Sequence, residues 1–396
     1  MGCYVLYAMP ASLYSAKARS YLRKQRIAHL ERPPGDPRYQ AEVMPATRRW
    51  IIPVLQTPEG ALVQDTVDII DYLEQAEVAP ERSAYPQTPV QLAVAHLLEL
   101  FGGEGLLRPA MHYRWNFDED NLAFLFEDFT AALVPNGDEP ARQGVFEYAS
   151  TRMRKATERL GVLPGTIAEI ERSYGEFLGL LDAHLGRAPY LLGGRPTLAD
   201  FALVGPLYAH LARDPHPSTL MKRSARRVWR WVERMHAPSL DCGEYQDQSG
   251  ALFGDDRIPQ TLRALLAYVG EEFTAEMLAQ VSWIDGWLAE NPQIADGDVV
   301  GGKPDRRALG TTVFAWRGHE LEVAVLPYRL YLLQRLQNAF ADAPADSRGQ
   351  IARLFAEAGV EALLRVRPRR RLERRENVEI WGPSQDPVLD AGRVPQ

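Results

Sequence analysis

Two short stretches near the start of the chain carry residue types that bind or activate a small polar ligand. Ser12 follows a short apolar run and precedes a helical pattern, so its hydroxyl can cap the helix or donate to a bound anion. Asp65 and Thr66 open a second helical pattern. A helix N-terminus attracts a carboxylate, and an adjacent aspartate attracts an ammonium group. The pair would therefore suit the amino-acid end of a peptide, although plain capping of the helix explains it equally well.

A third stretch has a proline in the middle of a β-prone run, at Pro53 between Ile52 and Val54. Proline cannot donate to a sheet ladder, so it belongs at a sheet edge or in an unusual local geometry. A cis Ile52–Pro53 bond would turn the backbone groups of Ile52 outward, where they could pair with an extended peptide. An ordinary trans proline at a sheet edge is the alternative interpretation.

The elements around these stretches alternate between strand and helix over the first 76 residues. Strands are predicted at 4–7, about 28–31, 51–55 and 61–63, and helices at 15–26 and 66–75. Thr57-Pro58-Glu59-Gly60 predicts a hairpin turn between the last two strands. The pattern is that of a small α/β sheet domain.

A proline-bearing linker follows, and from residue 90 to about 237 the chain reads as helices, the last of them predicted at 219–236. A third region begins near residue 250. Its expected elements are a helix at 259–290 with a break near Gly270, a hairpin at 312–316 and 320–325, helices at 328–340 and 350–364, and an arginine-rich tail. The predicted domains are 1–78, 88–240 and 250–396.

Taken together, the motifs resemble the glutathione transferase family. The resemblance is carried by Leu6-Tyr7-x-x-Pro10-x-Ser12-x-Tyr14-Ser15, Ile52-Pro53-Val54-Leu55, Leu62-Val63-x-Asp65-Thr66 and the segment 190–201, which contains the capping box Thr197-x-x-Asp200. It covers about the first 240 residues. It implies a thioredoxin-like α/β N-terminal domain and an all-α helical-bundle domain, followed here by a mostly helical extension with a small β-hairpin.

The resemblance also implies roles for single residues. Pro53 would be a cis-proline, with the Ile52 backbone pairing with the cysteinyl part of glutathione. Asp65 and Thr66 would hold the γ-glutamyl end. Ser12 matches the catalytic serine or cysteine, and a serine argues against disulfide exchange, which needs a protein thiol. Tyr7 is the rival donor to the glutathione thiolate, and Tyr14 is a weaker rival.

Further site residues follow from position. Arg49, in a long loop before Pro53, is a candidate for the glycyl carboxylate of glutathione, with a solvated loop charge as the alternative. The stretch 108–117 falls where the family has its acceptor pocket. Its side chains would line that pocket or pack in the core at a helix end; with Tyr14, the candidate pocket residues are Met111, Tyr113 and Trp115.

Composition excludes several other functions. The 45 Lys and Arg against 52 Asp and Glu give a net charge of −7, which disfavours nucleic-acid binding. The chain has no secretory signal pattern and no uninterrupted apolar run long enough to span a membrane, which predicts a soluble cytoplasmic protein. No His-Glu-x-x-His pattern or Cys/His cluster predicts a metal. Two cysteines are too few for a disulfide framework, and both are expected as buried apolar side chains.

The sequence thus predicts a homodimeric glutathione transferase-like enzyme that uses glutathione as co-substrate and needs no metal. It would activate glutathione as a thiolate for attack on a small hydrophobic electrophile. The alternatives are a non-catalytic binding or scaffold protein of the same fold, or a glutathione-dependent lyase or dehalogenase of one metabolite. The seven arginines between 365 and 375 are expected to form a solvated or intersubunit face.

Overall fold

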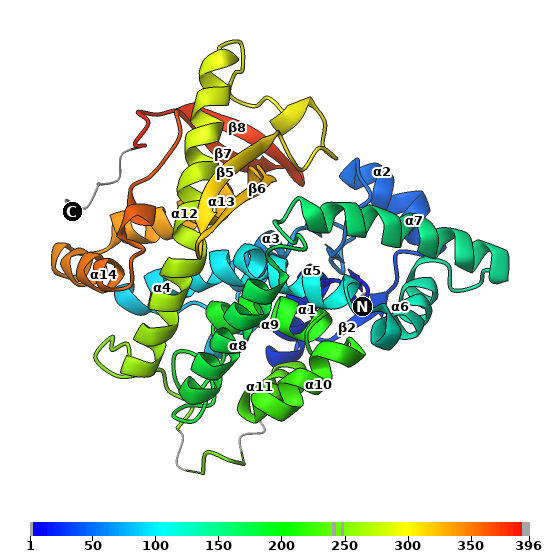
Figure 1. Cartoon of the computed structure of the whole chain (residues 1–396), viewed down its shortest axis with the longest axis horizontal. Coiled ribbons are helices and arrows are strands. Elements are labelled where there is room, and N and C mark those ends of the chain that lie inside the picture. Colours follow the sequence, from blue (N-terminus) through cyan, green and yellow to red (C-terminus); the bar gives the residue numbers. More distant parts are fainter. Residues whose placement is uncertain (1–2, 240–242, 247–248, 390–396) are drawn as a thin grey trace.

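The computed structural model describes residues 3–239, 243–246 and 249–389, whose arrangement is shown in Figure 1. A four-stranded sheet comes first, a group of helices second, and a C-terminal region of helices and two-stranded hairpins third. This order confirms the predicted fold class.

The N-terminal sheet has the strand order β2 (His29–Arg32), β1 (Tyr4–Tyr7), β3 (Val54–Gln56) and β4 (Leu62–Gln64). Strand β1 is parallel to β2 and antiparallel to β3, and β3 is antiparallel to β4. Helices α1 (Leu13–Lys24) and α3 (Thr66–Gln75) pack through apolar residues such as Leu22 and Ile70 into the largest core cluster, which also holds Leu6 and Leu55 of the sheet. The predicted thioredoxin-like domain is therefore present.

The helical part begins with a long apolar rod, formed by α4 (Pro89–Leu100), a π-helical turn (Phe101–Gly105) and α5 (Leu107–Trp115). The span 89–115 is apolar and long enough to cross a membrane, but 78% of its apolar window is buried inside the protein. It is the central core helix of this part. The remaining helices are α6 (Asp118–Leu133), α7 (Glu139–Glu158), α8 (Ile167–His184), α9 (Leu198–Ala209), α10 (Pro215–Ser224) and α11 (Arg226–His236).

The C-terminal region is built on the long helix α12 (Gln260–Glu290), which runs over most of the height of Figure 1. The two hairpins lie to the right of its upper end in this view, and helix α14 (Ala345–Glu357) lies to its left. Helix α13 packs against α4, so this region shares the main core with the rest of the chain. Its remaining elements are β5 (Thr311–Trp316), β6 (His319–Ala324), α13 (Tyr328–Asp342), α14 (Ala345–Glu357), β7 (Arg370–Arg375) and β8 (Val378–Ser384).

Several local predictions were wrong. Helix α12 has no break at Gly270, because this glycine allows a close approach: an added Cβ would lie 2.0 Å from the Ala358 carbonyl oxygen. The helix predicted at 219–236 is two helices, α10 and α11. Residues 370–384 form a second hairpin where only a charged tail was expected. Cys3 is exposed rather than buried, and Cys242 lies outside the described residues.

Candidate glutathione site

The strand directions and register bring the three predicted ligand-binding stretches to the same end of the sheet. Tyr7 pairs with Val54, and Val54 pairs with Gln64, so these residues form one row across β1, β3 and β4. Ser12 follows the end of β1, Pro53 precedes β3, and Asp65 follows β4. Because β1 and β4 both run antiparallel to β3, all three stretches extend beyond the same end of the sheet.

The Ile52–Pro53 peptide bond is cis, as expected. Tyr39 fixes the preceding residue: its hydroxyl accepts from the Ile51 amide at 2.9 Å and donates to the Ile51 carbonyl at 2.7 Å. Among the described residues, the backbone of Ile52 makes no hydrogen bond. Its N–H and C=O are therefore available to an extended ligand.

Asp65 is the N-cap of α3, and its backbone lies in the positive-φ region at φ 89°. Its Oδ1 accepts from the Val67 amide at 2.9 Å, so capping of the helix is part of its role. Thr66 stands at the first helical position with its residue 2% exposed, and its hydroxyl has no hydrogen-bond partner within the described ranges. The two residues thus leave a hydroxyl and a carboxylate oxygen at a helix N-terminus.

Ser12 caps α1 in the same way. Its hydroxyl oxygen accepts from the Ser15 amide at 3.2 Å, and the residue is half-buried. No acceptor for its hydroxyl proton lies among the residues that the structure describes. Ser12 can therefore donate that proton to an anion placed at the positive end of α1.

The two tyrosines considered as rivals of Ser12 lie in different surroundings. Tyr7 is 1% exposed and packs in a second core cluster, where its hydroxyl reaches Gln56 at 3.4 Å and burial raises its pKa. Tyr14 donates to Glu104 Oε1 at 3.0 Å, and burial raises its pKa too. Both tyrosine hydroxyls thus have an acceptor for their proton, whereas the Ser12 hydroxyl has none among the described residues.

The three predicted pocket residues on α5 are core residues instead. Met111 and Trp115 belong to the second core cluster with Tyr7, between the sheet and helices α5 to α7. Tyr113 faces the main core, where it packs against Tyr174. All three side chains are buried, which agrees with the alternative of core packing at a helix end.

Arg49 is not a solvated loop charge, so that interpretation was wrong, and its guanidinium is held by groups of the protein. Its side chain is 4% exposed and forms an ion pair with Glu379 of β8, at 2.6 Å. It also donates to the Pro304 carbonyl at 2.9 Å and to Gln64 Oε1 at 2.7 Å. This arginine clamps the C-terminal region onto the N-terminal domain.

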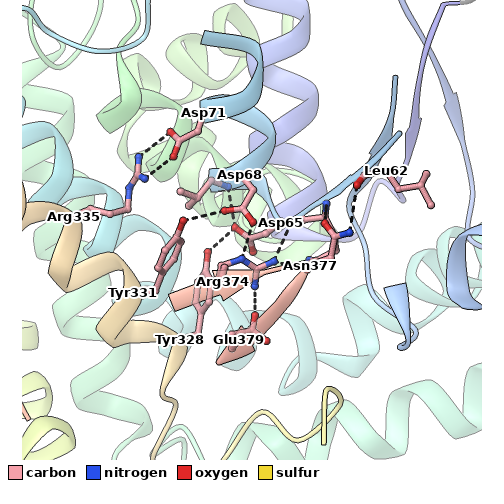
Figure 2. Close-up of polar contacts among 12 residues, drawn as sticks. Leu62, Asp65, Asp68, Asp71, Tyr328, Tyr331, Arg335, Arg374, Asn377 and Glu379 are labelled. Atoms are coloured by element: carbon pink, nitrogen blue, oxygen red, sulfur yellow. Dashed lines mark hydrogen bonds and ion pairs between the residues drawn. The ribbon is translucent and has the colours of Figure 1, made fainter. Parts of the chain in front are cut away.

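The C-terminal hairpin completes this clamp, as Figure 2 shows. Arg374, with its side chain 2% exposed, pairs with Asp68 at 2.8 Å and donates to the Gln64 carbonyl at 3.0 Å. The side-chain amide of Asn377 bonds the free edge of β4, accepting from the Gln64 amide and donating to the Leu62 carbonyl. Arg374 corrects the expectation that the arginine run is only a solvated or intersubunit face.

Helix α13 approaches α3 from the same side (Figure 2). The Tyr328 hydroxyl donates to Asp65 Oδ1 at 2.7 Å, and the Tyr331 hydroxyl donates to Asp68 at 3.0 Å. Sequence analysis missed both. A signal existed, because Tyr328 and Tyr331 are three residues apart, like Asp65 and Asp68, and such residues share a helix face.

Metal binding has no support in the part of the chain that the structure describes, where no group of three or more His, Cys, Asp or Glu side chains could hold an ion.

Two family models match the sequence. Residues 6–81 match the glutathione S-transferase N-terminal domain, and residues 164–234 match the glutathione S-transferase C-terminal domain. No curated protein matches the sequence significantly.

Similar solved structures include a glutathione S-transferase from Rhodospirillum rubrum, at 15% identity and TM-score 0.36, covering 66% of this chain and 99% of that one. Another is the glutathione transferase GSTFuA3 from Phanerochaete chrysosporium, at 17% identity and TM-score 0.42, covering 60% and 98%. A third, from Methylobacterium radiotolerans, is a complex with glutathione sulfonate, at 19% identity and TM-score 0.35, covering 60% and 92%. The chain thus carries the N-terminal and the C-terminal domain of the glutathione S-transferase family, over residues 6–81 and 164–234.

Proposed function

We propose that this protein is a glutathione transferase-like enzyme that binds glutathione at the end of the sheet where Ser12, Pro53 and Asp65 lie, and that it activates the glutathione thiol. One observation supports this most: the groups expected to bind the tripeptide lie at one end of the sheet and keep unused hydrogen-bonding capacity. These groups are the Ile52 backbone, the Ser12 hydroxyl proton and the Thr66 hydroxyl.

The chemistry follows from what each group can donate or accept. A free thiol is mostly protonated at neutral pH, and a nearby donor favours its thiolate form, which is the nucleophile. The Ser12 hydroxyl would be that donor, aided by the positive end of α1. The Ile52 backbone would pair with the cysteinyl unit, and Asp65 and Thr66 would bind the γ-glutamyl end. A hydrophobic electrophile as second substrate, a homodimer and a cytoplasmic location belong to the same proposal.

The test is a calorimetric titration of the full chain with glutathione, together with a thermal shift. We expect saturable binding, and a melting temperature that rises with glutathione because the ligand binds only the folded state. Asp65→Asn keeps the N-cap oxygen but removes the charge, so it should weaken binding without a matching loss of stability. Asp138→Asn, which changes the N-cap of α7 in the same way, is the control. An absence of heat and of thermal shift at millimolar glutathione contradicts the proposal.

One feature favours a second candidate, a non-catalytic glutathione-binding protein. The α5 residues expected to line an acceptor pocket are packed into the core beside Tyr7. A protein of this kind would bind glutathione in the titration but would show no turnover with any electrophile in a chemically diverse panel. Turnover with even one electrophile that depends on Ser12 excludes this second candidate.

A further inference from the structure

The C-terminal region reaches the candidate site with two side chains that lie outside both matched family domains. One is Tyr328, at the start of α13, and the other is Arg307, in the loop before β5. They approach the N-termini of α3 and α1, the two helix ends that border the site.

Tyr328 holds the Asp65 carboxylate in one orientation. Its hydroxyl donates to Asp65 Oδ1 at 2.7 Å (Figure 2). The Val67 amide donates to the same oxygen at 2.9 Å. Within the described residues, Asp65 Oδ2 has no hydrogen-bond partner. The two donors on Oδ1 therefore leave Oδ2 as the oxygen that can accept from a ligand.

Arg307 places an uncommitted positive charge nearby. Its guanidinium lies 5.7 Å from the centre of the Tyr14 ring, two residues beyond Ser12, and the residue is exposed. It makes no hydrogen bond or ion pair with any described residue. Burial lowers the pKa of Arg307, but the neighbouring Tyr14, Glu104, Glu379 and Asp65 outweigh it, so that the pKa is raised. A guanidinium in this position, with no hydrogen-bonded partner among the described residues, can pair with a carboxylate.

The loop that carries Arg307 is anchored on both sides. The Pro304 carbonyl accepts from Arg49 at 2.9 Å, and the Leu309 amide donates to the Val325 carbonyl at 3.1 Å. The position of the loop is thus fixed by backbone contacts, while the Arg307 guanidinium is not used in fixing it. A ligand-binding residue needs a fixed backbone and a side chain whose polar groups are not used within the protein, and Arg307 has both.

We infer that the C-terminal region recognises the charged amino-acid end of the ligand: Tyr328 positions Asp65 for the ammonium group, and Arg307 binds the α-carboxylate. An acid at the start of α3 and a guanidinium over the start of α1 together complement the two charges of a free α-amino acid group. The inference rests on the proposed function, and it adds specificity for a γ-glutamyl unit with both groups free. Tyr328 is a positioning residue, and Arg307 is a binding residue.

The experiment is a titration of the full chain and four variants with glutathione. Tyr328→Phe and Arg307→Gln should each weaken binding about tenfold, the effect of one lost hydrogen bond to a charged group. Tyr331→Phe removes the same kind of bond one turn along α13, from Asp68, and Arg306→Gln removes a neighbouring exposed guanidinium. Both controls should stay within about twofold of the wild type.

Two ligand analogues separate recognition from a general structural effect. Tyr328→Phe should bind glutathione lacking its α-amino group as well as the wild type does. Arg307→Gln and the wild type should bind glutathione with an amidated γ-glutamyl α-carboxylate equally well. Equal weakening for every ligand, or test variants no weaker than their controls, overturns the inference while leaving the proposed function standing. Failure of the wild type to bind glutathione overturns both.

Discussion

Ser12 performs the proposed activation through a single hydroxyl at the start of α1. Ser12→Ala removes the donor, so turnover should fall about 100-fold, the typical effect of losing one donor to a developing anion. The glutathione dissociation constant should change by less than about threefold, because the backbone and α3 contacts remain. Steady-state kinetics with saturating glutathione, read beside a titration, measures the two effects separately.

Ser12→Thr is the matched control, since threonine keeps both the hydroxyl and the capping oxygen. We expect it to retain most of the activity. If Ser12→Ala remains fully active, Ser12 is not the activator, and Tyr7 becomes the residue to change next.

At the level of single residues, the sequence predicted residues with a distinctive local geometry better than it predicted the contacts of charged side chains. Pro53 and Asp65 could be placed because proline and a helix cap have strong local signatures. Arg49 could not, because its partner Glu379 is 330 positions away in the chain. Arg374 had a usable signal: it lies two residues after the buried Leu372, so in a strand it shares that buried face.

The pairing of α3 with α13 is the main contact between elements near the site. Three aspartates of this helix and its cap, Asp65, Asp68 and Asp71, meet three side chains of α13 in order, namely Tyr328, Tyr331 and Arg335 (Figure 2). Arg335 also contacts the buried Glu99 of α4, at 3.3 Å. Helix α13 of the C-terminal region thus contacts acidic side chains of two helices, α3 and α4.

Arg335→Gln should therefore destabilise the protein by about 2 kcal/mol, because it leaves Asp71 without its cation and removes one of the two cations beside the buried Glu99, which keeps Lys17 at 2.7 Å. Arg365→Gln is the control: Arg365 is 62% exposed and meets Glu361 only at 3.8 Å, so its loss should cost almost nothing. Urea unfolding of both variants gives the comparison. Equal stability of the two variants would show that the α3–α13 contact contributes little.

A second contact between elements predicts a pH dependence. His184 of α8 is fully buried between the Leu191 carbonyl and the Thr261 hydroxyl of α12, each at 2.9 Å. Burial lowers its pKa from 6.5 to about 4. The unfolded chain therefore binds a proton in this range that the folded protein does not. Stability due to the neutral imidazole is complete above pH 6.5 and is lost as the pH falls towards 4.

The loss assigned to His184 is about 3 kcal/mol over this range. His184→Gln keeps one donor and one acceptor but cannot gain the proton. Its free energy of unfolding should fall less steeply than that of the wild type between pH 6.5 and 4. Parallel curves for the two proteins would contradict the assignment. Measurement by urea unfolding at several pH values is sufficient.

For the elements, prediction from sequence succeeded where the signal was local. Helix α3 was predicted at its observed bounds, because Asp65 caps it and its apolar residues recur at helical spacing. The break expected at Gly270 was wrong because a glycine in a helix has two explanations, flexibility and close approach. Only the position of Ala358, distant in the chain, decides between them.

At the scale of the whole molecule, the three predicted parts share one core. The largest hydrophobic cluster runs from Leu6 of the sheet through Leu97 of α4 to Trp381 of β8. Sequence patterns show which faces are apolar but not which faces meet, so this continuity could not be predicted. The division into 1–78, 88–240 and 250–396 stays a prediction about the chain rather than about separate folding units.

A shared core has a consequence for unfolding. If α13 and the β7–β8 hairpin stabilise the matched domains through α4 and the Arg49 clamp, the full chain should unfold in one cooperative transition. Calorimetry should give equal van't Hoff and calorimetric enthalpies, and glutathione should shift the whole transition upward. Arg335→Gln should lower the same single transition rather than split it. Two transitions, with only one moved by glutathione, would show instead that the C-terminal region unfolds independently of the site, and its contacts at Asp65 would then be too weak to position a ligand.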